Sequence, residues 1–163
     1  MKIRLAGIDD LETLIQLRLD YFRASELAEN QTVSERMANS VEVVPVRESL
    51  KKYFQKNLGE SLFVFLAEID GETAGAAFLI LFDWPPGPMA PGGRMGRAAN
   101  VLTYPQYRRQ GVATSLMGRL LEEAGRLGVS RIDLLATAAG EKLYRQLGFV
   151  ENTDHLNLQR PLD

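Results

Sequence analysis

The sequence predicts a mixed α/β (α+β) fold in which helices pack on a central twisted sheet. Three observations support this class. The chain has 163 residues, of which 45% are apolar and 25% charged, a composition typical of one globular domain, which we place over residues 1–163. Short runs with strand-like apolar patterns recur along the chain. Adjacent to them lie segments whose apolar residues are spaced three and four apart, as in amphipathic helices.

The first part of the chain should form a strand and two helices. Lys2–Leu5 alternates in the manner of a strand. Asp9, with Glu12 three residues later, predicts a helix start, and helical spacing continues to about Arg23. The apolar positions of that face are Leu11, Leu14, Ile15, Leu19 and Phe22. We interpret residues 24–44 as a mobile, acidic, partly helical segment. A second helical face, formed by Leu50, Tyr53, Phe54 and Leu58, should end at Gly59.

A hairpin and a loop follow. The strand-like runs Leu62–Ile69 and Glu72–Phe82 are separated by Asp70-Gly71, a pair that accepts the positive φ angles of a tight hairpin turn. Residues Trp84–Gly93 contain four prolines and three glycines, which sustain neither a helix nor a central strand. We therefore expect a loop there, with Trp84 as an apolar wall on one side of the site or the whole loop as a tolerated insertion.

The C-terminal half should alternate strands and helices. Met95–Tyr104 suits a strand that Pro105 must stop. The widest apolar stripe begins near Gly111 and predicts a long amphipathic helix. The remaining elements expected are a strand over Arg131–Ala136, a short helix over Ala139–Leu147 and a strand over Thr153–Leu158.

Composition excludes several kinds of site. The chain has no cysteine and one histidine, His155, so disulfides, thiol nucleophiles, zinc knuckles and sites with two imidazoles are excluded. We interpret His155 as structural and expect no metal. A net charge of −2 argues against nucleic-acid partners. Without a stretch of about 20 apolar residues or a secretory signal, we expect no membrane partner and a cytoplasmic location.

One stretch has the pattern of an anion site. A strand, the basic turn Arg108-Arg109 and a helix start follow one another there. The first turn of a helix exposes N–H groups without partners, and its dipole adds positive potential. Gly111 allows close backbone approach, and the small Ala113 leaves the path open. Together these features predict a pyrophosphate cradle.

Arg108-Arg109-Gln110-Gly111-Val112-Ala113 resembles the acyl-CoA binding motif of the GNAT acetyltransferase superfamily. Some thirty residues later, Leu143-Tyr144-Arg145-Gln146-Leu147-Gly148-Phe149 resembles the second signature of that family. The order of the expected elements is similar over nearly the whole chain. The resemblance implies a GNAT-like acyl-CoA N-acyltransferase fold, with a central mixed, mostly antiparallel twisted sheet flanked by about four helices, and acetyl-CoA as cosubstrate.

The resemblance also implies roles for single residues. Tyr144 matches the general acid that protonates the departing thiolate, while the cofactor brings the sulfur. Backbone groups of the strand would pair with the pantetheine arm, the turn would hold the pyrophosphate, and Thr137 stands where several members have Asn. The implied acetyl-CoA-binding residues are Val101, Leu102, Thr103, Arg108, Arg109, Gln110, Gly111, Val112, Ala113, Thr114 and Thr137.

We thus predict an N-acetyltransferase in which a primary amine attacks acetyl-CoA directly. Some members carry a carboxylate on the motif strand, whereas this chain has Arg97-Ala98-Ala99-Asn100 there, so Glu26, Glu29 and Asp83 are the candidate bases. The alternative is a non-catalytic acyl-CoA sensor. A phosphate-loop hydrolase is disfavoured because no Gly-Lys-Ser/Thr ending follows the glycines. The sequence leaves the acceptor open between small amines, peptide N-termini and lysines, and the acidic residues favour a cationic acceptor. It also leaves open whether the acyl group is always acetyl and whether the protein is a homodimer.

Overall fold

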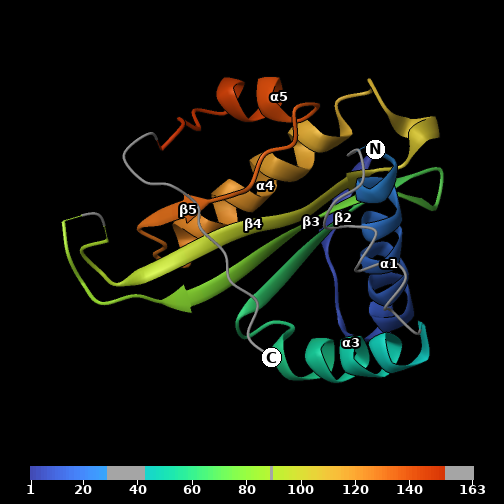
Figure 1. Cartoon of the computed structure of the whole chain (residues 1–163), viewed down its shortest axis with the longest axis horizontal. Helices are drawn as coiled ribbons and strands as arrows, with labels where there is room; N and C mark the ends of the chain where they lie inside the picture. Colours follow the sequence, from blue (N-terminus) through green and yellow to red (C-terminus); the bar gives the residue numbers. More distant parts are fainter. Residues whose placement is uncertain (29–42, 89, 153–163) are drawn as a thin grey trace.

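The computed structural model describes residues 1–28, 43–88 and 90–152 of the chain (Figure 1). Within them the expected mixed architecture, with four α-helices, is confirmed. The elements in chain order are β1 (Lys2–Leu5), the 3-10 turn η1 (Ile8–Asp10), α1 (Leu11–Ala28), α3 (Val43–Asn57), β2 (Leu62–Ile69), β3 (Glu72–Asp83), β4 (Arg94–Thr103), the 3-10 turn η2 (Pro105–Tyr107), α4 (Val112–Arg126), β5 (Arg131–Asp133) and α5 (Glu141–Gln146).

The five strands form one sheet in the order β1-β2-β3-β4-β5. The first three pairs are antiparallel, and β5 joins β4 in parallel. Asp70 (φ 52°) and Gly71 (φ 84°) make the β2–β3 turn, as their sequence predicts. The loop between β3 and β4 is also a hairpin connection, since the Trp84 amide donates to the Gly93 carbonyl at 2.6 Å.

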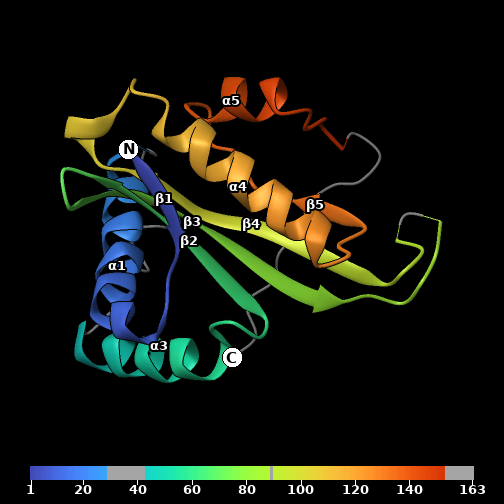
Figure 2. The same ribbon diagram turned by 180° about the vertical axis from the view of Figure 1, so that it is seen from behind.

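Helices cover both faces of the sheet (Figures 1 and 2). On one face α4 lies across the strands, with Leu116, Met117 and Leu120 among the buried residues of that layer. On the other face α1 and α3 pack with buried residues that include Leu14 and Phe54. Alternation along the strands sends neighbouring side chains to opposite layers, so each face receives its own core.

Gly75 of β3 is required by close packing. A Cβ there would lie 2.4 Å from the carbonyl oxygen of Leu102 and 3.3 Å from Cγ1 of Val112. Because hydrogen takes the place of that carbon, the end of β4 and the first residue of α4 both approach β3. One glycine therefore sets the relative position of the two elements that flank the basic turn.

The predicted cap of the first helix is wrong. The N-cap is Gly7, the 3-10 turn η1 precedes α1, and the carboxylate of Asp10, not that of Asp9, accepts the backbone N–H of Gly7 at 2.8 Å. Asp10 also pairs with Arg4 of β1 at 2.8 Å, an interaction that sequence spacing does not reveal. Phe22, expected on the buried face, is 37% exposed.

Of the last two predicted strands, one is shorter than expected and the other falls outside the described residues. The strand expected over Arg131–Ala136 covers only Arg131–Asp133, because β5 leaves β4 at that point. The strand expected over Thr153–Leu158, with His155, lies outside the described residues. So do residues 29–42 of the acidic segment expected over 24–44, whose described ends belong to helices: α1 continues past Arg23 to Ala28, and α3 begins at Val43. None of the described helices has the length and apolarity of a membrane span.

Candidate functional site

The middle of β4 contains a bulge. In the register with β3, Ala99 pairs with Phe78 and Leu102 with Ala76, so Asn100 and Val101 oppose a single β3 residue. Asn100 adopts a left-handed conformation with φ 49°, which Asn tolerates better than most residues. A bulge of this kind bends the strand and re-aims its backbone groups.

Beyond Arg97, one edge of β4 has no strand partner among the described residues. β5 pairs only with Met95, Gly96 and Arg97, and the described chain places no other strand on that side. From Ala98 to Thr103 this edge is therefore open, over a length of about 20 Å at 3.3 to 3.4 Å per residue. An extended ligand with amide groups can pair with such an edge as a further strand would.

The basic turn at the end of β4 is a row of unused hydrogen-bond donors. None of the backbone N–H groups from Arg109 to Thr114 has an acceptor among the described residues; the next amide, that of Ser115, donates to the Gly111 carbonyl at 3.0 Å. Arg109 (φ 64°) and Gly111 (φ 78°) are left-handed, and such residues turn successive amides toward a common concavity. The turn is thus built to hold an anion at the start of α4.

These features fit the pyrophosphate and arm of acetyl-CoA. A Cβ on Gly111 would meet nothing within 4 Å, so the space in front of the turn is free. The Arg108 side chain donates back to the Thr103 carbonyl at 3.3 Å, which keeps its charge beside the turn. The hydroxyl of Thr103 is buried and has no partner among the residues that the structure describes, so it can still pair with a polar group at the end of the open edge.

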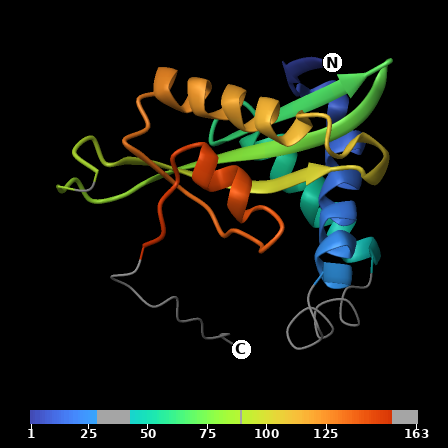
Figure 3. The same ribbon diagram turned by 90° about the horizontal axis from the view of Figure 1, so that it is seen from above.

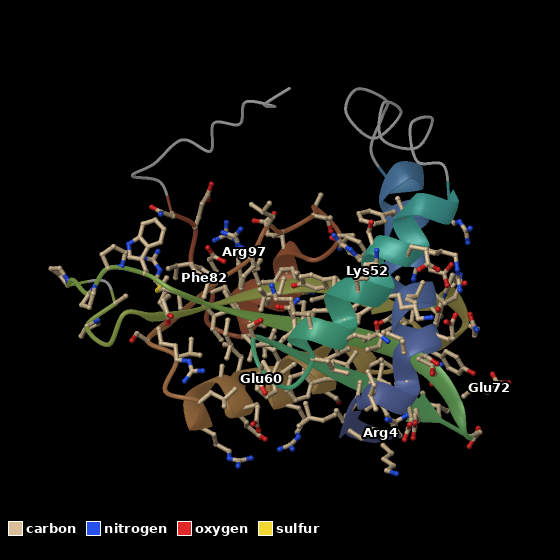
Figure 4. The ribbon with its side chains drawn as sticks, turned by 90° about the horizontal axis from the view of Figure 1, so that it is seen from below. Arg4, Lys52, Glu60, Glu72, Phe82 and Arg97 are labelled. Atoms are coloured by element: carbon tan, nitrogen blue, oxygen red, sulfur yellow. The ribbon has the colours of Figure 1, made fainter. Side chains whose placement is uncertain are left out.

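Tyr144 and Thr137 line a cleft of about 890 Å³. Its walls come from β4 and β5, from the segment around α5, and from Trp84 of the β3–β4 loop, which supports the expectation of an apolar wall there. At one end, Arg97 makes a two-pronged pair with Asp133 at 2.7 Å and lies 5.9 Å from the ring centroid of Phe82 (Figure 4).

Tyr144 is half-buried with a free phenol. Its ring packs edge-on against Phe149, with 6.0 Å between centroids, and the hydroxyl has no hydrogen-bond partner among the described residues. A Cβ on Gly140 would lie 2.7 Å from Cε2 of Tyr144, so Gly140 makes room for the ring. Burial, with a smaller effect of Tyr21, raises the pKa of Tyr144. A tyrosine phenol is protonated at neutral pH even without this shift, so Tyr144 can act as a proton donor.

The expected bases have different outcomes. Asp83 is exposed at the end of β3 and does not line the cleft, while the side chains of Glu26 and Glu29 lie outside what the structure describes. The carboxylates of the cleft wall are engaged by arginines: Asp133 by Arg97, and Glu141 and Glu151 by Arg145.

The structure brings the predicted residues together in two groups, joined by the open edge of β4. Tyr144 and Thr137 meet at the cleft, and residues 108–114 form the turn at the far end. Val101–Thr103 lie along the edge between them, with Leu102 buried toward α1 and α3. In the view of Figure 3, the end of β4 lies between α5 and α1.

Sequence reasoning missed the contribution of α1. Tyr21 lies close enough to influence the pKa of Tyr144, and Nη1 of Arg18 donates to Oδ1 of Asn100 at 3.0 Å. The helical pattern predicts only that α1 packs on the sheet. It does not reveal that β4 bulges opposite Arg18, which is what brings the two side chains together.

Comparisons with known proteins show what the whole chain is similar to. The model of the acetyltransferase (GNAT) family matches residues 13–149. A structure from Clostridium acetobutylicum, described as a predicted acetyltransferase with acetyl-CoA, is 25% identical with a TM-score of 0.80 and covers 97% of this chain and 95% of its own. A GCN5-related N-acetyltransferase from Ralstonia eutropha is 26% identical with a TM-score of 0.78, and the match covers 99% of this chain and 97% of that protein.

More distant structures share the fold. A ribosomal-protein-alanine N-acetyltransferase from Brucella melitensis is 18% identical with a TM-score of 0.68, covering 98% of this chain and 100% of its own. No curated protein sequence matches the chain significantly.

Proposed function

Because the chain belongs to the GNAT family of acetyltransferases, we propose that it transfers the acetyl group of acetyl-CoA to a primary amine by direct attack within a ternary complex. The observation that carries this proposal is the continuous arrangement of the donor turn at residues 109–114, the open edge of β4 and the protonated Tyr144. An extended thioester of CoA can lie along it with its pyrophosphate at α4 and its sulfur near the cleft.

Acetyl-CoA supplies the activated acyl group and the leaving thiol. The chain positions it through β4 and the turn, and such positioning can contribute about 7–11 kcal/mol when the reacting atoms are held in near-attack geometry. An amide at the bulge beside Leu102 can donate to the thioester carbonyl, where negative charge develops. As the C–N bond forms and the C–S bond breaks, the phenol of Tyr144 gives its proton to the sulfur, while the amine nitrogen loses a proton to water and solvent returns one to Tyr144.

The experiment is a thiol-release assay with acetyl-CoA over a broad amine panel at pH 8. We expect release with at least one amine class, and a fall in kcat of about 100-fold or more in Tyr144→Phe, the range for loss of a general acid. The matched control is Tyr107→Phe, since the Tyr107 hydroxyl donates to Glu72 at 2.8 Å, outside the cleft. Unchanged turnover in Tyr144→Phe would remove Tyr144 from the mechanism.

Titration calorimetry with CoA completes the test. Tyr144→Phe should bind CoA as the wild type does, whereas Gly111→Val should lose affinity because valine strongly disfavours positive φ. Tight CoA binding without thiol release on any amine would refute the transferase and favour the acyl-CoA sensor instead.

A further inference from the structure

Arg18 of α1 is a half-buried cation among neutral groups. Besides its hydrogen bond to Asn100, the guanidinium carbon lies 4.2 Å from the ring centroid of Phe22 and 5.7 Å from that of Tyr21. Tyr53 of α3 is also close enough to interact with it. No carboxylate among the described residues lies within ion-pair distance of Arg18.

Asn100 adds a second donor at the same point. Arginine has only donors, so the amide atom that faces Arg18 must be the oxygen. The amide nitrogen is then the atom without a partner, and Asn100 is 1% exposed. Buried donors are nearly always satisfied in folded proteins. This pair therefore has several unused N–H groups and, in the described chain, no acceptor for them.

The surroundings of Arg18 favour an incoming negative charge. Burial lowers the pKa of Arg18 below its usual value, which means that its environment solvates the positive charge poorly. Cation–π contact with Phe22 compensates part of this. An anion that reaches the guanidinium would compensate the rest, through the charge-assisted, two-pronged hydrogen bonds that arginine makes with carboxylate or phosphate.

The location of Arg18 connects it to the reaction. Asn100 is the first residue of the β4 bulge, and Val101 begins the stretch along which the CoA arm is proposed to lie. Tyr21 contacts Arg18 on one side and influences Tyr144 on the other. Arg18 thus lies near the proposed reacting end, on the face of the sheet opposite to α4.

We propose that Arg18, supported by the amide of Asn100, binds an anionic group of the acceptor, so that the acceptor is an amine that also carries a carboxylate or a phosphate. This inference rests on the proposed function, because it assigns the substrate class of the same site. Amines that carry only positive charge would be repelled by the guanidinium. The anion selects and orients the acceptor, and its amine reaches the thioester.

Binding tests the inference without turnover. The full chain is saturated with CoA and titrated calorimetrically with pairs of products: N-acetyl amino acids against their carboxamides, and N-acetylethanolamine phosphate against N-acetylethanolamine. We expect at least one anionic member to bind tenfold or more tighter than its neutral partner, and the pair that shows this preference identifies carboxylate or phosphate. Arg18→Gln should abolish the preference. Equal affinities in every pair, or a preference that persists in Arg18→Gln, would overturn the inference.

Kinetics with the corresponding free amines separate recognition from packing. Arg18→Gln should raise KM for the anionic amine tenfold or more, with kcat within a few-fold and CoA affinity unchanged. The matched control is Arg23→Gln, an exposed arginine of the same helix that pairs with Asp20; it should keep the preference. A purely structural Arg18 would instead lower kcat equally for both members of a pair. If no amine releases thiol, the proposed function fails, and the calorimetric ratio still decides the role of Arg18.

Discussion

Replacing Gly111 with alanine tests the anion turn with the smallest change. The residue has φ 78° and nothing within 4 Å of the added methyl group, so the substitution creates no clash and only backbone strain. A left-handed non-glycine residue costs about 1–2 kcal/mol. If the turn keeps its shape, this cost lowers the free energy of unfolding, and Tm falls by about 2–4 °C per kcal/mol for a chain of this size.

If the turn relaxes instead, the strain is avoided in the free protein and the N–H groups no longer converge. CoA affinity then falls at least five- to 30-fold, the same 1–2 kcal/mol expressed in binding. Thermal unfolding and CoA calorimetry therefore have to be read together. The control is Gly118→Ala, also without a neighbour within 4 Å but inside α4, where alanine should stabilise by about 0.5–1 kcal/mol. A Gly111→Ala protein with unchanged stability and unchanged affinity would refute the reasoning.

Three further predictions, two on substitutions and one on pH dependence, test other parts of the structure. Gly140→Ala should push the Tyr144 ring out of place, since the new Cβ would lie 2.7 Å from it; we expect kcat to fall roughly 10- to 100-fold in the thiol-release assay with CoA affinity retained. Burial and a hydrogen bond to Asp20 raise the pKa of Tyr104. The contribution of this tyrosine to the free energy of unfolding is therefore intact below pH about 10 and declines as the pH rises further. Urea unfolding at a series of pH values will measure this decline. Asp10→Asn removes a carboxylate whose pKa the Arg4 guanidinium lowers; stability at pH 7 should fall by about 1 kcal/mol, and the difference from wild type should shrink as acid protonates the carboxylate.

Each of these has a control and a contrary result. The control Gly87→Ala lies in an open loop with nothing within 4 Å of the new methyl group and should leave kcat unchanged. Equal kcat in Gly140→Ala and wild type would show that catalysis does not depend on the position of the Tyr144 ring. Tyr104→Phe should flatten the decline of stability above pH 10, and an unaltered slope would assign the decline to other groups. Asp9→Asn, at the exposed neighbour of Asp10, should have little effect, and a larger loss there than in Asp10→Asn would contradict the observed cap.

Most of the fold could be predicted because its local signals agree with its tertiary packing. The Asp70-Gly71 turn and the strands around it, the stripe of α4 and the class of the sheet are determined by side chains near one another in sequence. The cap before α1 could not be predicted because Asp9 and Asp10 both offer a carboxylate there, and the carboxylate that bonds back to the Gly7 N-cap is the one that also pairs with Arg4 on another element. The length of β5 depends on where it leaves β4, which no residue within β5 encodes.

The donor turn of the site was predictable for a similar reason, since Arg108–Thr114 form it from consecutive residues. The open edge of β4 and the cleft were not, because they depend on which strand pairs with which and how far. Tyr144 was identified through a resemblance, and the structure adds that the cleft half-buries its ring, which raises the pKa of the phenol further above neutral. The role of α1 could not be predicted because it depends on the bulge at Asn100, and no pattern of residues in the sequence marks that change in strand register.

The charges around Asn100 bear on the choice of acceptor. A carboxylate on the motif strand would favour a cationic amine, but the stretch Arg97-Ala98-Ala99-Asn100 has none. The amide oxygen of Asn100 instead accepts a hydrogen bond from Arg18, so a positive charge lies beside the bulge. A pair that combines a half-buried guanidinium with a buried, unpartnered amide nitrogen is suited to receive an anion and poorly suited to receive a polyamine. The electrostatics of the bulge, which lies at the proposed reacting end, therefore favour an acceptor with an anionic group.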